Sequence, residues 1–477
     1  MTQYDLTTKI LPYLDRHLGF PMLLNESLEK LYKPEEVLAA TYDLAKETDL
    51  VDFSLGLWNR LHPDQEPPAE FSVKRAKTLE NIEKLEKEAH TISEAIENPE
   101  FVQAIRADKL ENLKYLQDKF KITLEQLEAL YNFGQLQYSI GNYSVAADYL
   151  YHFRILSTNP ALILSAQWGK LACDLLVGNW DTALEELQSL KEAIDTASSA
   201  TLGGSSALAL SQLQSRTWLL HWSLFVYFQH PEGRTHLLEL FLSTAYLNTI
   251  QTSCPWILRY LASAAILSRK SLSSPSSSAS RALRGSLQTI VKILQTEAYQ
   301  YEDPITKFLT ELYGDFDFEG AQKWLSEAET VLAGDFFLND FKDEFLENAR
   351  FIVSEAYIRI HQKIDIADLS ATLKLSQSEG EKWIVNLIRE TRMGAEAKID
   401  LEKNIVTTQR SQPPVYQSII EKTRGLARRT QDLAIDINRR AFGEGGGEGQ
   451  GQRGGQEKEK RAPAAAPPPA ATAVPVR

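Results

Sequence analysis

The sequence predicts a mainly α-helical protein. A solenoid of stacked, tetratricopeptide-like helical repeats leads into a winged-helix module, a C-terminal helix and a disordered tail. Apolar residues recur at helical spacing as far as about residue 392. The spacing then becomes alternating for a short stretch, which is typical of strands. From about residue 442 the chain is rich in Gly, Glu and Gln and then in Ala and Pro, a composition that cannot bury a core.

The amino-acid composition limits the classes of protein to which this chain can belong. The 477 residues are 43% hydrophobic and 24% charged, which is enough apolar material for a large core. A net charge of −13 argues against a protein that coats nucleic acid, because phosphate binding needs clustered Lys and Arg. The two cysteines, Cys173 and Cys254, have no zinc or disulfide spacing and fit a reducing cytosol. We expect no signal peptide, and we interpret the longest apolar stretch, Trp218 to Phe228, as a buried core helix.

A weak internal repeat supports stacked helix pairs. The pattern of a small polar residue, an aromatic residue, two spacers and an alanine occurs at Asn142–Tyr143–Ala146, Asn179–Trp180–Ala183 and Asp317–Phe318–Ala321. In the first two cases a glycine, Gly141 or Gly178, precedes the pattern. It can end one helix in the left-handed conformation while the Asn or Asp side chain caps the next. The alternative is an ordinary helix–turn–helix connection without any solenoid.

A long apolar stripe predicts one helix that neighbouring helices must cover. Its positions share one helical face: Leu338, Phe341, Phe345, Ala349, Ile352, Ala356 and Ile360.

A second helix, highly charged, has a narrow apolar seam. Its seam residues are Val73, Ala76, Leu79, Ile82, Leu85, Ala89, Ile92 and Ile96. It can dock on a partner helix or serve as a solvated spacer packed on its own domain, and the sequence leaves both interpretations open.

Residues 364–409 carry the winged-helix prediction. The first helix is marked by Ile366, Leu369 and Leu373, and a tight turn at Lys374 and Leu375 follows it. Ser376 and Glu379 form a capping box for a second helix that runs to about Arg392. That helix is expected to bury Trp383, Ile384, Leu387 and Ile388. Residues 397–401 and 404–409 then form a hairpin around a turn at Glu402 and Lys403.

The hairpin is the first part of the candidate partner interface. The second helix of the module has three basic side chains, Lys382, Arg389 and Arg392, balanced by three acidic ones, Glu379, Glu381 and Glu390. Because a helix that reads a DNA groove is normally basic, we favour protein interaction over a nucleic-acid-binding regulator. The hairpin's exposed edge would pair with the sheet of another protein in the same assembly. Its candidate interface residues are Lys398, Ile399, Asp400 and Ile405.

The last helix, from about Val415 to Arg440, is the second part of the candidate interface. Its expected buried positions are Ile419, Ile420, Leu426, Leu433, Ile435 and Ile437. Six basic residues outnumber three acidic ones, and Arg424, Arg428 and Arg429 are the candidate contact residues. A local RNA contact is one interpretation. We favour packing in a bundle with partner C-terminal helices.

Helical repeats that lead into a winged helix resemble the PCI module of the proteasome lid, the COP9 signalosome and initiation factor 3. Short sequence segments spread along the chain resemble, in particular, the family of the e subunit of eukaryotic translation initiation factor 3. They include Tyr4–Thr8, Leu14–Leu18, Asn142–Ser144, Trp168–Leu171, Arg216–Trp218, His221–Phe225, Leu258–Leu261, Asp303–Thr306, Glu347–Arg350, Trp383–Arg389 and Ala397–Asp400. Departures from the family's pattern lie near Thr201, in the Ser-rich segment and in the tail.

The resemblance implies a non-catalytic, cytoplasmic scaffold subunit. Its partners would be the other initiation factor 3 subunits and the small ribosomal subunit, where the factor promotes recruitment of messenger RNA and initiator transfer RNA. A PCI scaffold subunit of the signalosome or of the proteasome lid is the alternative. The sequence offers no phosphate loop, paired zinc histidines or nucleophile with a base partner, so we expect no catalytic, cofactor or metal site and no membrane partner.

The expected domains follow from these patterns. Helical repeats occupy residues 1–215, and the PCI domain occupies 216–409, with a helical bundle at 216–362 and the winged helix at 363–409. The C-terminal helix follows at 413–441 and the disordered tail at 442–477. Flexible loops are expected at 197–206 and 268–280, which are rich in small residues.

Overall fold

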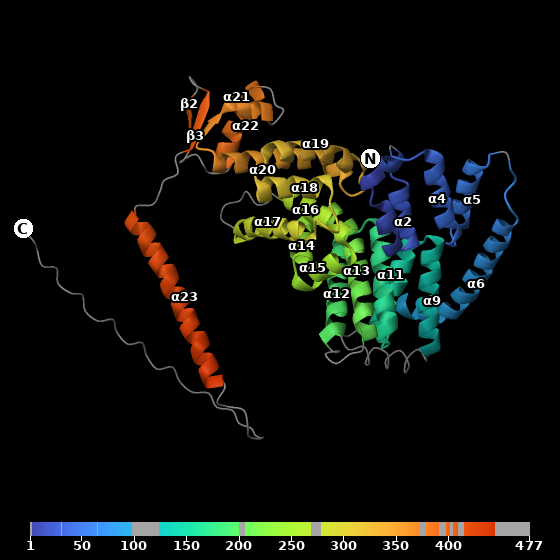
Figure 1. The fold of residues 1–477 in the computed structure, drawn as a ribbon. Coiled ribbons are helices and arrows are strands. Elements are labelled where there is room, and N and C mark those ends of the chain that lie inside the picture. The colour runs from blue at the N-terminus through green and yellow to red at the C-terminus, as the bar shows by residue number, and fades with distance from the viewer. Residues whose placement is uncertain are drawn as a thin grey trace, which may run out of the picture. The chain divides into compact units, whose positions relative to one another are not determined.

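The computed structural model describes residues 2–29, 31–63, 65–97, 124–199, 206–268, 278–372, 377–390, 397–400, 404–408 and 415–443. The chain divides into two compact units, residues 1–409 and 410–477. Helices form nearly all the described regular structure, and the described residues contain a single sheet of three short strands (Figure 1). The mainly α fold class predicted from the sequence is confirmed.

The first unit begins with short helices that join its main core. They are η1 (Thr2–Tyr4), α1 (Thr7–Ile10), η2 (Leu11–Tyr13), α2 (Arg16–Leu23), α3 (Glu26–Glu29), α4 (Pro34–Lys46) and α5 (Val51–Leu61). Leu6, Ile10, Leu18 and Met22 are buried in the same cluster as residues more than 200 positions later in the chain. Helix α2 lies against α11 (Pro160–Val177), and η2 lies against α13 (Ser206–Gln229). The N-terminal segment is therefore built into the solenoid.

Helix α6 (Glu70–Glu97) is the charged helix with the narrow seam. Its C-terminal half packs against α9 (Leu124–Ile140), and Ala89 and Ile92 are buried there. Its N-terminal half leaves Val73 and Leu79 exposed. The N-terminal half also contacts its own domain, because it lies against α5 and Lys74 donates to the Lys46 carbonyl at 3.0 Å. The apolar seam of that half is nevertheless left partly open at Val73 and Leu79.

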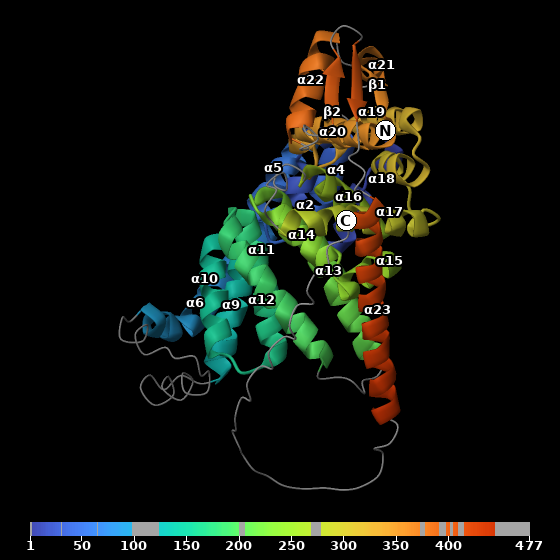
Figure 2. The ribbon, with the colours of Figure 1, turned by 90° about the vertical axis from the view of Figure 1, so that its left-hand side faces the viewer.

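Consecutive antiparallel helices follow and pack side by side (Figure 2). They are α9 (Leu124–Ile140), α10 (Tyr143–Leu156), α11 (Pro160–Val177), α12 (Trp180–Ser199) and α13 (Ser206–Gln229). Gly141 and Gly178 have φ values of 102° and 87°, so both helix ends use the left-handed conformation expected for them. The alanines of all three repeat patterns, Ala146, Ala183 and Ala321, are fully buried. A small side chain at these points allows neighbouring helices to approach closely.

The predicted side-chain caps are correct in one case and wrong in another. Asp317 accepts hydrogen bonds from the backbone N–H groups of Glu319 and Gly320 at 3.0 and 3.2 Å. Asn142 makes no such bond and instead donates its side-chain N–H to Gln137 Oε1 at 2.8 Å. Its side chain is diverted by an acceptor in the preceding helix, which spacing alone does not reveal.

The remaining helices of the first unit complete the main core. They are α14 (Gly233–Phe241), α15 (Thr244–Ser253), η3 (Pro255–Ile257), α16 (Leu258–Leu267), α17 (Ser278–Glu297), α18 (Pro304–Thr310), the π-helical turn η5 (Glu311–Asp315), α19 (Phe318–Gly334), η6 (Asn339–Phe341) and α20 (Lys342–Ile360). All of α16 is buried, so it is the central helix of this part. The expected domain boundary at residue 215 lies within α13 and stays a prediction.

The long apolar stripe belongs to two elements and not to one helix. Leu338 precedes a 3-10 turn at Asn339–Phe341, and Phe341 is the last residue of that turn, directly before α20. Phe345, Ala349 and Ile352 are buried as expected, whereas Ile360 at the C-terminal end of α20 is 49% exposed. Spacing identified the buried face of the helix but not the break in the backbone before it.

Two expected loops are corrected at their ends, and residues 200–205 and 269–277 between these ends lie outside the described residues. The segments expected to be loops are partly helical, because α12 continues to Ser199, α13 begins at Ser206 and α17 begins at Ser278. Serine is tolerated in the end turns of helices, where its hydroxyl can bond to free backbone groups. The apolar stretch in α13 is buried except for Trp218, which is 45% exposed.

The winged helix ends the first unit. It consists of β1 (Lys363–Asp365), α21 (Ile366–Thr372), α22 (Gln377–Glu390), β2 (Ala397–Asp400) and β3 (Ile405–Thr408). Leu373, the turn at Lys374–Leu375, Ser376, Arg392 and the turn at Glu402–Lys403 lie outside the described residues, as does the Glu379 side chain. Of the expected buried residues, Ile384, Leu387 and Ile388 are buried and Trp383 is half-buried.

The second unit contains α23 (Val415–Gly443), close to the predicted bounds of the last helix. The tail after residue 443 lies outside the described residues. Within the described part of the chain, no helix combines the length and apolarity that a bilayer crossing requires.

Candidate partner-binding surfaces

The sheet of the winged helix has a third strand, β1, that the sequence did not predict. Its strand order is β1-β3-β2, with both pairs antiparallel. Strand β1 was missed because it has only three residues, although their burial alternates exposed, buried, exposed around Ile364. Since β3 is bonded on both sides, the backbone of Ile405 is not available to a partner strand. Of the two strands of the predicted hairpin, only β2 has an edge that no other described strand pairs with, and this is called its free edge.

The candidate residues on β2 lie beside this free edge. Ile399 is opposite Val406 in the ladder, and Val406 is opposite Ile364 on the other side. Directly opposed side chains share a face of the sheet, so these three form one apolar row. Val406 and Ile364 are 1% and 2% exposed, whereas Ile399 at the end of the row is 36% exposed. Lys398 and Asp400 point to the opposite face of the sheet.

The helices of the module hold this sheet in place. Trp383 in α22 packs on Phe351 in α20 with ring centroids 4.2 Å apart, and its Nε1 donates to Ser354 Oγ at 3.3 Å. The backbone N–H of Ile366 donates to the carbonyl of Asn404 at 3.0 Å, which ties α21 to the start of β3. The free edge is therefore carried on a module that is anchored to the solenoid.

Helix α23 carries the other candidate residues, Arg424, Arg428 and Arg429, and all three are exposed. The positions expected to be buried are exposed in this chain. Their exposed fractions are 53% for Ile419, 52% for Ile420, 62% for Leu426, 61% for Leu433, 45% for Ile435 and 63% for Ile437. Ile419, Leu426, Leu433 and Ile437 lie along one side of the helix, because they are 7, 7 and 4 residues apart. The described part of the second unit contains no other element that could cover this apolar side.

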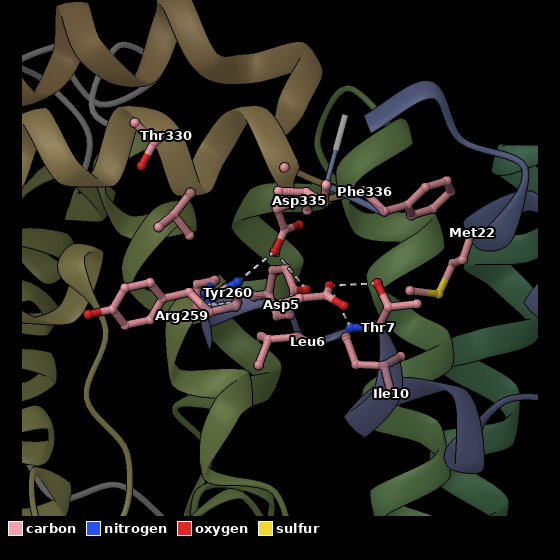
Figure 3. A pocket seen from close by; sticks show the side chains of 14 residues that line it. Asp5, Leu6, Thr7, Ile10, Met22, Arg259, Tyr260, Thr330, Asp335 and Phe336 are labelled. Carbon is pink, nitrogen blue, oxygen red and sulfur yellow. Dashed lines mark hydrogen bonds and ion pairs between the residues drawn. The ribbon is translucent and has the colours of Figure 1, made fainter. Parts of the chain in front are cut away.

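A buried ion cluster fixes the geometry of the region before the winged helix (Figure 3). Arg259 in α16 is 1% exposed, and its Nε donates to Asp303 Oδ2 at 2.6 Å while its Nη1 donates to Asp335 Oδ2 at 3.0 Å. Its Nη2 donates to the carbonyl of Tyr4 at 2.7 Å. A single side chain thus joins α16, the start of α18, the end of α19 and the N-terminal segment. Figure 3 shows Arg259 and Asp335 pointing toward each other beside Asp5 and Thr7.

The two carboxylates of this cluster are themselves held by the local backbone. Asp303 caps α18 in a reciprocal capping box with Thr306, with distances of 2.7 and 2.9 Å. Asp335 accepts from the backbone N–H of Phe337 at 3.0 Å. Burial alone would lower the pKa of Arg259, but Tyr301 and the two aspartates raise it above its usual value. The sequence signal for this cluster is an arginine inside the otherwise uncharged stretch Leu258–Leu267.

The structure places the seven candidate interface residues in two groups. Lys398, Ile399, Asp400 and Ile405 lie together on the sheet of the first unit, and the three arginines lie together on α23 of the second. Among the described residues, no cluster of His, Cys, Asp or Glu is arranged to hold a metal ion. The arrangement offers strand pairing at β2 and helix packing on α23.

Stacked helices that end in a three-stranded winged helix define the PCI class of proteins, and the PCI domain model matches residues 325–410. A second model, described as the N-terminal domain of initiation factor 3 subunit 6, matches residues 5–137.

Curated relatives cover nearly the whole chain and share one description, the E subunit of eukaryotic translation initiation factor 3. The relative from Mycosarcoma maydis is 45% identical over 92% of this chain and 86% of its own length. The relative from Cryptococcus neoformans is 47% identical, over 91% of this chain and 92% of its own length. The relative from Aspergillus clavatus is 46% identical, over 90% and 92%. The chain belongs to the family of the E subunit of eukaryotic translation initiation factor 3.

Proposed function

We propose that this chain is a non-catalytic scaffold subunit of the initiation factor 3 complex and works in the cytoplasm. As part of that complex it supports recruitment of messenger RNA and initiator transfer RNA to the small ribosomal subunit. The observation that carries the proposal is the free edge of β2 with the half-exposed Ile399 beside it, in a chain that belongs to this initiation factor family. A neighbouring protein of the complex adds its sheet edge to β2, and α23 packs on partner helices through its exposed apolar side.

Both surfaces are better suited to binding other proteins than to catalysis or to recognition of a DNA groove. A strand edge exposes unpaired backbone N–H and C=O groups that a second strand can bond. The exposed apolar side of α23 would be costly to leave in water, at about 25 cal/mol for each Å². The basic residues of the same helix suit acidic partner surfaces, and a local RNA contact stays part of the proposal.

Substitution of Ile399 by Asp tests the edge. We expect Ile399→Asp to reduce the recovery of sibling subunits with the tagged full-length chain at least about fivefold, because a charge beside a strand edge opposes pairing. Recovery is measured by quantitative mass spectrometry of the purified assembly.

The matched control is Leu210→Asp. Leu210 is an exposed leucine in α13, 59% accessible, far in sequence from the winged helix. The substitution makes a comparable change from an apolar to a charged side chain. The recovery of sibling subunits with this variant should stay at the level of the unaltered chain. Normal assembly of the Ile399→Asp chain would show that the partner does not use β2.

A further inference from the structure

A second surface of the first unit has the properties of a binding pocket. The cavity has a volume of about 560 Å³ and is lined mainly by the repeat helices α9 and α11. Single residues of α6, α10 and α13 and the residue before α2 complete its walls. Helices α9 and α11 lie side by side in Figures 1 and 2. A volume of this size is typical of small-ligand and side-chain pockets. It is remote in sequence from the strand edge and α23, so it goes beyond the proposed function.

One wall of the pocket is aromatic and rigid. Trp168 in α11 and Trp222 in α13 meet edge to face, with ring centroids 4.8 Å apart. The indole N–H of Trp222 donates to the carbonyl of Tyr13 at 3.1 Å, which fixes that ring. Indole faces attract cations through their quadrupole, and the planar guanidinium group also stacks on them.

The charge of the pocket is negative. Asp15 is the one acidic residue among the described lining residues, and Lys and Arg do not occur among them. Its Oδ1 accepts from the His17 backbone N–H at 2.9 Å and from Tyr138 OH at 2.6 Å. Its Oδ2 accepts no hydrogen bond from the described residues. One carboxylate oxygen is thus oriented by its neighbour and left available.

Neutral acceptors complete the lining. Gln135 is exposed and donates its Nε2 to Tyr131 OH at 2.7 Å, which leaves its Oε1 as an acceptor. Asn132, one helical turn earlier on α9, adds a second exposed amide. A carboxylate and two amide oxygens match the several in-plane donors of a guanidinium group better than the compact charge of an ammonium group.

We propose that this pocket binds an arginine side chain presented by an extended segment of a partner protein. The guanidinium stacks against the indole wall and donates to Asp15 Oδ2, while the polypeptide follows the exposed amides of α9. Stacked helical repeats offer elongated surfaces of this kind to peptides. The net charge of −13 draws basic segments toward the chain.

The test uses the full-length chain and two blocked tripeptides. The probe is acetyl-Gly-Arg-Gly-amide, and its neutral counterpart contains citrulline, which has nearly the same shape without the charge. Binding is followed by saturation-transfer NMR titration. We expect the arginine probe to bind at least about tenfold more tightly than the citrulline probe, since charged hydrogen bonds and a cation over an indole favour it.

Two variants locate the site. Asp15→Asn keeps the shape of the side chain and its ability to cap α2, and it should weaken arginine binding about tenfold. Gln135→Lys places a positive charge at an exposed position of the lining and should weaken binding similarly without touching the core. Asp181→Asn, an exposed acid at the start of α12, makes the same charge change elsewhere and should have no effect.

Three results would overturn the proposal. The first is no binding of the arginine probe, and the second is equal binding of the citrulline probe or of all three variants. The third is tight binding of spermidine without binding of the arginine probe, because the pocket would then hold a free polyamine and not a peptide side chain. These outcomes are independent of the Ile399 test.

Discussion

Arg259 shows how a single residue organises the region before the winged helix. Its guanidinium is 1% exposed and bonds Asp303, Asp335 and the Tyr4 carbonyl. A buried arginine is costly to desolvate, and only its full set of partners offsets that cost. The cluster thus makes the relative placement of four segments depend on one side chain.

Replacing Arg259 by Met is expected to destabilise the first unit by about 3–5 kcal/mol, because two buried carboxylates lose their counter-charge. Urea unfolding followed by circular dichroism measures the change. Hydrogen exchange should also increase at residues 2–10, which lose the bond to Tyr4. Arg16→Met is the control: Arg16 pairs with Glu47 on the surface at 3.0 Å, with both side chains more than half exposed, and its loss should cost less than about 1 kcal/mol.

Asp174 gives a pH-dependent prediction. Burial raises its pKa to about 6, although Lys170 opposes the shift, and its Oδ2 has no hydrogen-bond partner. Since this pKa is above that of the unfolded chain, the folded state carries the penalty of the buried charge above pH 6 and loses it as the pH falls toward 4. Asp174→Asn should therefore raise stability by about 1–3 kcal/mol at pH 7.5.

The gain should shrink as the pH is lowered from 7.5 to 5, because Asp174 of the unaltered protein then takes up a proton in the folded state. Thermal melting at the two pH values measures it. A variant that is less stable than the unaltered protein at pH 7.5 would mean that the ion pair with Lys170 outweighs the cost of burial.

At the residue scale, helical spacing predicts side chains that are buried at regular intervals. It does not predict side chains whose partners lie far away in the sequence. The buried alanines Ala146, Ala183 and Ala321 follow from helical spacing. The partners of Arg259 lie 44, 76 and 255 positions away, and no local pattern indicates such distances. The pocket beside Asp15 was missed for the same reason, since its lining comes from several helices.

At the scale of elements, period and turn chemistry predicted which segments are helices and which strands better than where they begin. The left-handed glycines and the hairpin follow from sequence. The separate 3-10 turn before α20 and the three-residue strand β1 do not, because a helical stripe continues across the turn and three residues are too few to show alternation. The failure to predict β1 had the largest consequence, because this strand pairs with β3 and leaves β2 as the hairpin strand with a free edge.

Helix α23 yields the element-scale prediction. Its apolar side is exposed at Leu426 and Leu433, which are 62% and 61% accessible. The double variant Leu426→Asp/Leu433→Asp should lower the recovery of sibling subunits at least tenfold, because two buried leucines contribute about 3 kcal/mol or more to a helix interface. The melting temperature of the isolated chain should stay unchanged.

Gln431→Asp on the same helix is the control for that prediction. Gln431 is exposed and lies on the side away from Leu433, so its substitution adds a charge without removing apolar surface. Equal losses for the control and the double variant would indicate that α23 acts through its charge and not through packing.

At the scale of the whole molecule, the fold is a solenoid that carries an anchored winged helix, followed along the chain by a second unit whose described part is the amphipathic helix α23. The family and the mainly α architecture were predictable because the signals are spread along the entire chain. The surfaces that bind partners were less predictable, because they depend on which strand edges and helix faces the fold leaves uncovered. We propose that these uncovered surfaces, and not an enclosed active site, account for the function.

Hydrogen exchange at β2 tests the strand-edge claim most directly. Exchange is compared between the free full-length chain and the same chain in the purified assembly, in peptides that cover residues 397–400 and 405–408. We predict that the β2 amides that face away from β3 exchange rapidly in the free chain and at least about tenfold more slowly in the assembly. The β2 amides that bond to β3, and those of β3 between β1 and β2, are protected in both states. Equal, rapid exchange of β2 in the free and assembled states would contradict the account.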